Sequence, residues 1–332
     1  MAHARNQSMP DYDDIYRSLA PWLHTDDLSF VNLETPVEAE REPSDYPSFN
    51  ARPAYVEAAI HGGFNVFSLA NNHANDYGKA SVEGTLRTLE TLGRKYPITW
   101  SGLRHSPGDP IRPTVIDLGA WKVGFVALTN VINQTSGEDQ VNLVRLWDVW
   151  TGRINAPAVD QLVDQIRRWR NGVDVLVVSL HDGVEYALAP DPAQVAIYRR
   201  LVAAGADVLW CNHPHVLLPW AWVATDRGPR LVMFSMGNFV SRQTGGLTPE
   251  DADTRQARTG DGALMRVRFT RVPKTGVRLV ADPLLTSNYN DPERGTIVVP
   301  TEILVEHAPG PWKAYFRRRL AFEQPWLVPV QY

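Results

Sequence analysis

Side chains that can bind a metal ion follow four short apolar runs of the chain. Each run is typical of a buried strand, so these groups are expected where strands end. A set of glutamate, asparagine and neutral histidine suits a borderline divalent ion such as manganese, zinc or iron. The sequence therefore predicts a metal site at the carboxyl ends of neighbouring strands. The groups, with the apolar run before each, are Glu34 (28–33), Asn72 and His73 (64–69), His181 (173–180), and His213 and His215 (206–210).

Predicted helices alternate with these strands along the chain. Because the strands are almost continuously apolar, the alternation indicates an α/β fold with a largely covered sheet. The stretches 134–152 and 242–260 are polar and rich in turn residues, which favours loops there. The helices are expected at 13–23, 53–62, 81–92, 158–170 and 192–204, and further strands at 113–118, 122–129 and 231–234.

The sequence shows no clear domain boundary. We expect one domain over residues 1–290 and an extension over 291–332. The tail from residue 300 contains Trp312, Phe316 and Trp326, together with other aromatic residues, and is expected to pack on the domain or to form a dimer contact.

Composition excludes several classes of protein. The net charge of −4 gives no basic surface for nucleic acid. No apolar run approaches the roughly 18 residues that a transmembrane helix needs, and residues 1–30 show no apolar core of a secretory signal. The single cysteine, Cys211, fits a reducing compartment. These features predict a soluble cytoplasmic protein that binds neither nucleic acid nor membrane.

Five motifs occur in order within residues 15–270. They are Phe30-Val31-Asn32-Leu33-Glu34-Thr35-Pro36, Ser68-Leu69-Ala70-Asn71-Asn72-His73 with Asp76-Tyr77-Gly78, Val178-Ser179-Leu180-His181 with Gly183, Glu185 and Tyr186, Gly205-Ala206-Asp207-Val208 leading to His213-Pro214-His215, and Phe234-Ser235-Met236-Gly237-Asn238-Phe239. Together they resemble the poly-γ-glutamate capsule-synthesis (CapA-type) family of the calcineurin-like metallophosphatase superfamily. The resemblance implies a four-layer α/β/β/α sandwich of two mixed sheets with metal ions at the strand ends.

The resemblance also implies a role for individual residues. Glu34 is expected to bridge two divalent ions, and His215 to reach one of them. The other ion is expected to be held by Asn72, His181 and His213. His73 is expected to act on the substrate as an acid or base, oriented by Asp76. Weaker candidates for binding substrate are Glu185, Asn238 and Arg242.

One departure from the family pattern concerns the N-terminus. The family begins with a strand ending in Gly-Asp, whose aspartate is a metal ligand, whereas this chain begins Met1-Ala2-His3. We expect that the natural start lies one strand upstream, with His3 as an alternative ligand. Asp182 and Cys211 are smaller departures, at positions where the family has an aromatic residue and glycine.

The implied site supports three functions. The first is hydrolysis of a phosphoester or related anionic substrate, with two metal ions activating water and His73 protonating the leaving group. The second is epimerisation of a peptide or polyglutamyl chain by exchange of an α-proton. The third is a metal-poor scaffold within a capsule or peptide biosynthetic complex.

Overall fold

The computed structural model of the chain describes residues 12–272 and 276–331. It is a mixed α/β structure built on a seven-stranded sheet. Four central strands, β5, β6, β7 and β9, are parallel, so their carboxyl ends share one edge of the sheet. The strand order is β13 (Val330–Gln331), β8 (Leu217–Val223), β9 (Arg230–Met236), β7 (Val208–Asn212), β6 (Val175–His181), β5 (Lys122–Thr129) and β4 (Thr114–Asp117).

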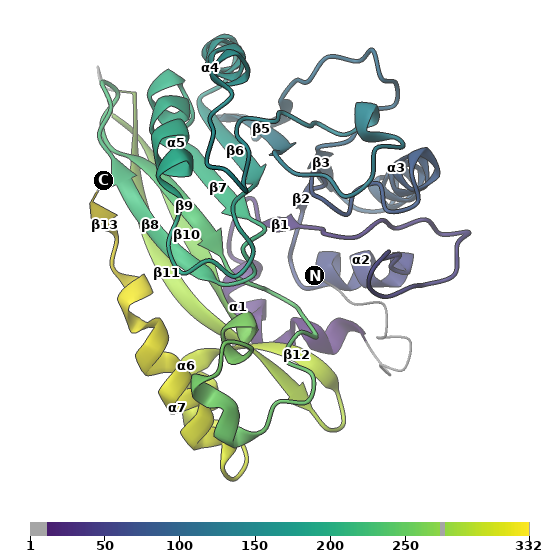
Figure 1. Ribbon diagram of the computed structural model, residues 1–332, viewed down its shortest axis with the longest axis vertical. Coiled ribbons are helices and arrows are strands. Elements are labelled where there is room, and N and C mark those ends of the chain that lie inside the picture. Colours follow the sequence, from purple (N-terminus) through teal and green to yellow (C-terminus); the bar gives the residue numbers. More distant parts are fainter. Residues whose placement is uncertain (1–11, 273–275, 332) are drawn as a thin grey trace.

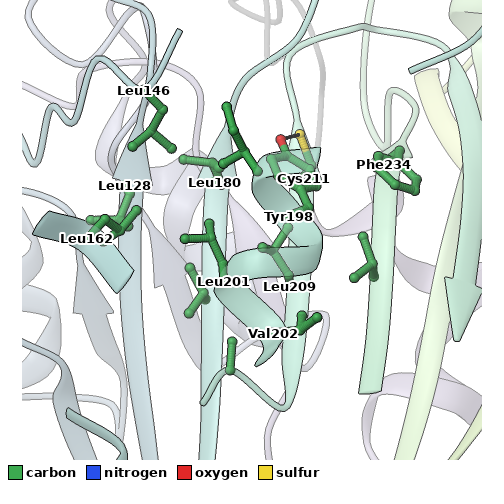
Figure 2. Packing of buried hydrophobic residues seen from close by; sticks show 14 of the residues in the cluster. Leu128, Leu146, Leu162, Leu180, Tyr198, Leu201, Val202, Leu209, Cys211 and Phe234 are labelled. Carbon is green, nitrogen blue, oxygen red and sulfur yellow. Dashed lines mark hydrogen bonds between the residues drawn. The ribbon is translucent and has the colours of Figure 1, made fainter. Parts of the chain in front are cut away.

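Helices α4 (Ala156–Arg170) and α5 (Pro192–Ala204) cover one face of this sheet (Figure 1). Side chains of a strand alternate between faces, so every second residue of β6 faces the helices. Leu176, Val178 and Leu180 do so and join the core beneath α4 and α5. Figure 2 shows this core, with side chains of α5 lying over those of the central strands.

The opposite face of the sheet packs against two smaller sheets. The first is parallel and contains β1 (Phe30–Asn32), β2 (Val66–Ser68) and β3 (Thr99–Ser101). The second is an antiparallel meander of β10 (Asp261–Val272), β11 (Gly276–Asp291) and β12 (Gly295–Pro300). The structure thus has three sheets among its described residues, where the sequence predicts two.

The helices agree with the sequence-based expectations except near the N-terminus. Helices α2 (Pro53–His61), α3 (Lys79–Gly93), α4 and α5 confirm the predictions within a few residues. The single helix expected at 13–23 is instead three short pieces. Pro21 lies in the first turn of the last piece, where its missing N–H interrupts the helix and starts a new one. The pieces are the 3-10 turns η2 (Tyr12–Ile15) and η3 (Arg17–Leu19) and helix α1 (Ala20–Leu23).

The two stretches predicted as loops contain short 3-10 turns and, in the first, isolated β-bridges at Val141, Leu143 and Trp147, but no α-helix or longer strand. The 3-10 turns are η4 (Glu138–Gln140) in the first stretch, and η5 (Pro249–Asp253) and η6 (Ala257–Gly260) in the second. Within residues 12–272 and 276–331, no helix combines the length and apolarity needed to cross a membrane.

The C-terminal residues pack on the body of the protein. Trp326 lies against Trp220 of β8, and each indole N–H donates to a backbone carbonyl of the other segment. A buried ion pair joins Arg319 to Asp261 at the start of β10. This region consists of α6 (Thr301–His307), α7 (Trp312–Glu323), the 3-10 turn η7 (Gln324–Leu327) and β13.

Candidate metal centre

Contact between two sheets brings the predicted ligands together. The hydroxyls of Ser68 on β2 and Ser179 on β6 lie 2.9 Å apart, which aligns the two strands. Asn72 follows β2 and His181 ends β6, and Asn72 Oδ1 lies 2.9 Å from His181 Nε2. Residues separated by more than a hundred positions in sequence therefore meet where the strands end.

The segment between β7 and β8 presents two histidines in an unusual backbone conformation. His213 has φ 112° and His215 has φ 60°, a region that costs energy for residues other than glycine. Such strain persists where surrounding contacts hold it, and it is concentrated at functional sites. Pro214 between them is fixed from outside, because its carbonyl accepts a hydrogen bond of 2.8 Å from the backbone N–H of Tyr186.

Ligand atoms of Glu34, His213 and His215 all lie within 4.8 Å of one another, and all three residues are buried. Oε1 of Glu34 is 3.9 Å from His215 Nε2 and 3.7 Å from His181 Nε2. A hydrogen bond would bring such atoms to about 2.9 Å. Two atoms bound to one ion at about 2.1 Å each can lie as far as about 4.2 Å apart. This buried cluster of one glutamate and two histidines could hold a metal ion.

Several atoms of the cluster are left without a hydrogen-bond partner among the described residues. They are Glu34 Oε1, His213 Nδ1 and His215 Nε2. Buried polar atoms are rarely left unsatisfied, and these three are the atom types that bind divalent ions. The cluster thus has the donors of a metal site and lacks internal partners for them.

Burial also sets the charge of the imidazoles. It lowers the pKa of His213 to about 4 and the pKa of His181 well below its ordinary value. The neighbouring His213 lowers the pKa of His181 further. Burial likewise lowers the pKa of His215 and raises the pKa of Glu34. Neutral imidazoles offer lone pairs at neutral pH, which is the form that binds metal.

His73 and Asp76 form a buried pair beside the cluster. Nδ1 of His73 lies 2.9 Å from Oδ2 of Asp76, which also accepts a hydrogen bond of 2.7 Å from the backbone N–H of Phe49. The Phe49 ring packs edge-on against the imidazole, with centroids 4.6 Å apart. With Nδ1 directed at a carboxylate, Nε2 is the ring atom available to a substrate.

Two further side chains support predicted ligands and were missed from the sequence. Asn133 accepts a hydrogen bond of 3.4 Å from Asn72 Nδ2, and its backbone N–H donates to the Asn72 carbonyl. Gln243 Oε1 accepts a hydrogen bond of 3.0 Å from Asn238 Nδ2, and Asn238 Oδ1 lies 3.0 Å from His215 Nδ1. Asn133 is 61 positions from Asn72, whereas Gln243 is five positions from Asn238 and acts through it on His215. Both lie in loops, and no local pattern marks either residue.

Asp182 and Cys211, the two smaller departures from the family pattern, contact each other. Cys211 Sγ donates to the Asp182 carbonyl at 3.2 Å, and the Tyr198 hydroxyl lies 3.0 Å from Asp182 Oδ2. The same hydroxyl lies 3.1 Å from Cys211 Sγ (Figure 2). Trp147 Nε1 also donates to the Asp182 carboxylate. Burial raises the pKa of Asp182 to about 6. This network lies directly behind His181 and anchors the end of β6.

The remaining predicted residues have different surroundings. Glu185 is exposed, with 47% of its side chain accessible, and its Oε1 is 4.0 Å from His215 Nε2. Asn238 is buried behind His215. Arg242 is exposed and makes no side-chain hydrogen bond or ion pair within the described ranges. Met1 and His3 lie outside the described residues, so the expectations about them stay predictions.

A cavity of about 820 Å³ leads from this cluster along the face of the large sheet. Its walls are two strand edges. Among the described residues β1 pairs only with β2, and β10 pairs along its length only with β11, apart from one bridge between Gly237 and Gly262. Its floor is apolar, and its lining reaches Glu34, His213 and His215. We call this cavity the slot.

Together these features define a class, an α/β protein with a buried cluster that could hold a divalent ion where its strands end. The chain belongs to the family described as "Bacterial capsule synthesis protein PGA_cap", whose model matches residues 1–243. The family resemblance seen in the motifs is thereby confirmed.

Curated relatives carry names from the same area. The chain is 26% identical over 249 residues to "Capsule biosynthesis protein CapA" of Bacillus anthracis, covering 70% of this chain and 54% of that protein. It is 25% identical over 242 residues to "PGA biosynthesis protein CapA" of Bacillus subtilis (strain 168), covering 70% and 57%. It is 25% identical over 233 residues to a "Probable polyglutamine synthesis accessory protein" of Mycobacterium tuberculosis, covering 66% and 57%. The chain thus spans little more than half the length of these relatives.

Proposed function

We propose that the protein is a divalent-metal-dependent enzyme, most simply a hydrolase of a phosphoester or a related anionic substrate. The observation that carries this proposal is the convergence of unpartnered atoms of Glu34, His213 and His215 where strands of two sheets end. Two divalent ions bound there would activate water and neutralise developing negative charge.

The proposal includes two ions that would share Glu34. Its Oε1 lies 3.7 Å from His181 Nε2 and 3.9 Å from His215 Nε2, so one carboxylate could serve ions held by either histidine. We assign Asn72, His181 and His213 to one ion and His215 to the other, with Glu34 shared. Manganese, zinc and iron all suit this mixture of oxygen and imidazole ligands.

His73 is proposed as the residue that moves a proton to or from the substrate. The Asp76 carboxylate accepts from Nδ1 and so fixes the ring, leaving Nε2 to face the substrate. An imidazole held in this way can protonate a leaving group, a contribution worth about 10²–10⁴-fold in rate.

We also propose that the two small sheets act together as one layer, so that the protein is a four-layer α/β/β/α sandwich of two mixed sheets. The slot supports this proposal, because its lining includes residues of both β1 and β10 and reaches Glu34 and His215.

The hydrolase proposal is tested with chromogenic phosphomonoesters and phosphodiesters in the presence of manganese. Wild type should turn over at least one of them only with metal, and His73→Asn should lose about 10²–10⁴-fold. His307→Asn, at an exposed position, is the control and should keep wild-type activity. Absence of turnover with every metal and ester, or full activity of His73→Asn, would refute the proposal.

A second candidate function follows from the names of the relatives, which concern capsule and polyglutamate synthesis. The substrate would then be a peptide or polyglutamyl chain, epimerised by proton exchange between groups such as His73 and Glu185. Transfer of deuterium from solvent to an α-position would support it. Failure with both peptides and polyglutamate would count against it.

The same names also suggest an accessory role inside a biosynthetic complex. A purely structural role predicts that His181→Ala and His213→Ala bind the partner as tightly as wild type does. We further propose a cytoplasmic location, a possible homodimer, and residues 291–332 as an extension of a domain over residues 1–290.

A further inference from the structure

We propose that Glu185 is a further ligand of the ion assigned to Glu34 and His215, approaching it from the exposed side of the cluster. The inference rests on the proposed metal site and extends its ligand set. It gives Glu185 a direct role at the metal rather than at the substrate alone.

The hydrogen-bond partners of His215 show which of its ring nitrogens carries the proton. Asn238 Nδ2 donates to Gln243 Oε1 and to the Thr259 carbonyl, so its other side-chain atom, Oδ1, is the acceptor. This oxygen lies 3.0 Å from His215 Nδ1, which must therefore carry a proton. In the neutral ring the lone pair is then on Nε2.

Two carboxylate oxygens face that lone pair at nearly equal distances. Nε2 of His215 is 3.9 Å from Glu34 Oε1 and 4.0 Å from Glu185 Oε1. Both distances are too long for a hydrogen bond. Both suit atoms that share one ion, since metal–nitrogen and metal–oxygen bonds are each about 2.1 Å. A cation bound by Glu34 and His215 would therefore lie within reach of Glu185, whose exposed side chain can turn toward it.

The backbone fixes Glu185 in this position. Gly183 has φ 114°, and a Cβ placed there would lie 3.1 Å from Pro214 Cγ, so the loop passes close to the His213–His215 segment. Tyr186 has φ 61° and donates its backbone N–H to the Pro214 carbonyl at 2.8 Å. Glu185 lies between these two contacts. The carboxylate is therefore carried by a loop fastened to the segment that supplies His215.

The experiment measures manganese binding to metal-free protein by isothermal titration calorimetry, in wild type, Glu185→Gln and Glu185→Asp. Cobalt binding, followed by visible absorption, reports the ligand shell independently of activity. We expect Glu185→Gln to weaken one binding event about tenfold or more and to change the cobalt spectrum. Glu185→Asp keeps the charge but shortens the side chain, so a ligand role predicts weakened binding there too.

The control is Glu302→Gln, which removes the same charge from an exposed position on α6 and should bind as wild type. Wild-type affinity and spectrum in Glu185→Gln would overturn the inference alone. Wild-type metal affinity in Glu185→Asp would also overturn the inference. The negative charge would then be enough, without a side chain long enough to touch the ion. Failure of wild type itself to bind any ion would overturn the proposed metal site together with this inference.

Discussion

Glu34 Oε1 and His215 Nε2 lie 3.9 Å apart, and neither has a hydrogen-bond partner among the described residues. Glu34 follows β1 of the small parallel sheet, whereas His215 lies between β7 and β8 of the large sheet. The pair therefore depends on the packing of one sheet against the other. Metal binding and the association of the sheets should be coupled, since an ion held by both residues ties the sheets together.

The first prediction concerns the orientation of His215. Asn238→Ala removes the oxygen that faces Nδ1, so the ring loses its preferred tautomer and direction. We expect manganese affinity to fall about 10–100-fold. Titration calorimetry on the metal-free variant measures this, with Asn171→Ala, at an exposed position after α4, as the control. Equal affinities of Asn238→Ala and wild type would show that the contact does not position a ligand.

A second prediction concerns Asn133, which holds the amide of Asn72. Asn133→Ala leaves Asn72 Nδ2 without this acceptor, so its Oδ1 is no longer directed toward His181. We expect a loss of affinity of about tenfold at the ion bound by Asn72 and His181. Thermal unfolding of the metal-free protein should change much less than metal affinity does. A large loss of stability without loss of affinity would mean that Asn133 serves only the loop.

The third prediction concerns the C-terminal residues. Trp326 is buried against Trp220, and its indole N–H donates to the Leu218 carbonyl at 2.6 Å. Trp326→Ala should lower the free energy of unfolding by about 3–5 kcal/mol, as for other buried tryptophans. Urea denaturation measures the change. The control, Trp150→Ala at a position 90% exposed, should alter stability by no more than about 0.5 kcal/mol; similar effects of the two changes would contradict the packing.

The fourth prediction is a pH dependence of stability. Burial, with the neighbouring Asp261, raises the pKa of Glu323 well above its ordinary value. The folded protein then holds this proton more tightly than the unfolded chain does. The resulting stabilisation is complete below the ordinary glutamate pKa and is lost as pH rises through the folded pKa.

Glu323→Gln stays neutral at every pH, so its stability relative to wild type should rise between about pH 5 and about pH 9. Melting curves over this range measure the difference. Glu306→Gln, at an exposed position, should follow wild type throughout. If the Glu323→Gln and wild-type curves run parallel, Glu323 is not a buried protonated carboxyl group.

Much of the fold and of the candidate site could be predicted because the signals are local. Apolar runs marked the parallel strands, and the ligand-type residues stood where those runs ended, as at His181 after β6. Parallel strands bring their carboxyl ends to one edge, so the convergence followed from the topology. The structure brings Asn72, His181, Glu34, His213 and His215 into one buried cluster.

The parts that were missed depend on long-range contacts or on signals that were overlooked. Strand β10 alternates Val267 and Phe269 with Arg266 and Arg268, a period-two pattern that could have identified it. The partners Asn133 and Gln243 lie in irregular segments, where only the folded structure shows which ligand each one contacts. The slot could not be predicted, because the sequence does not show that the edges of β1 and β10 face each other.

The most direct test of the account is the metal content of the purified protein after manganese supplementation and gel filtration, measured by elemental analysis. Three proteins are compared: wild type, the double variant His213→Ala with His215→Ala, and the exposed control His307→Ala. We predict that wild type and the control retain manganese in proportion to protein, and that the double variant retains none above background. Equal manganese in all three proteins, or none in wild type, would contradict the assignment of this cluster as a metal centre.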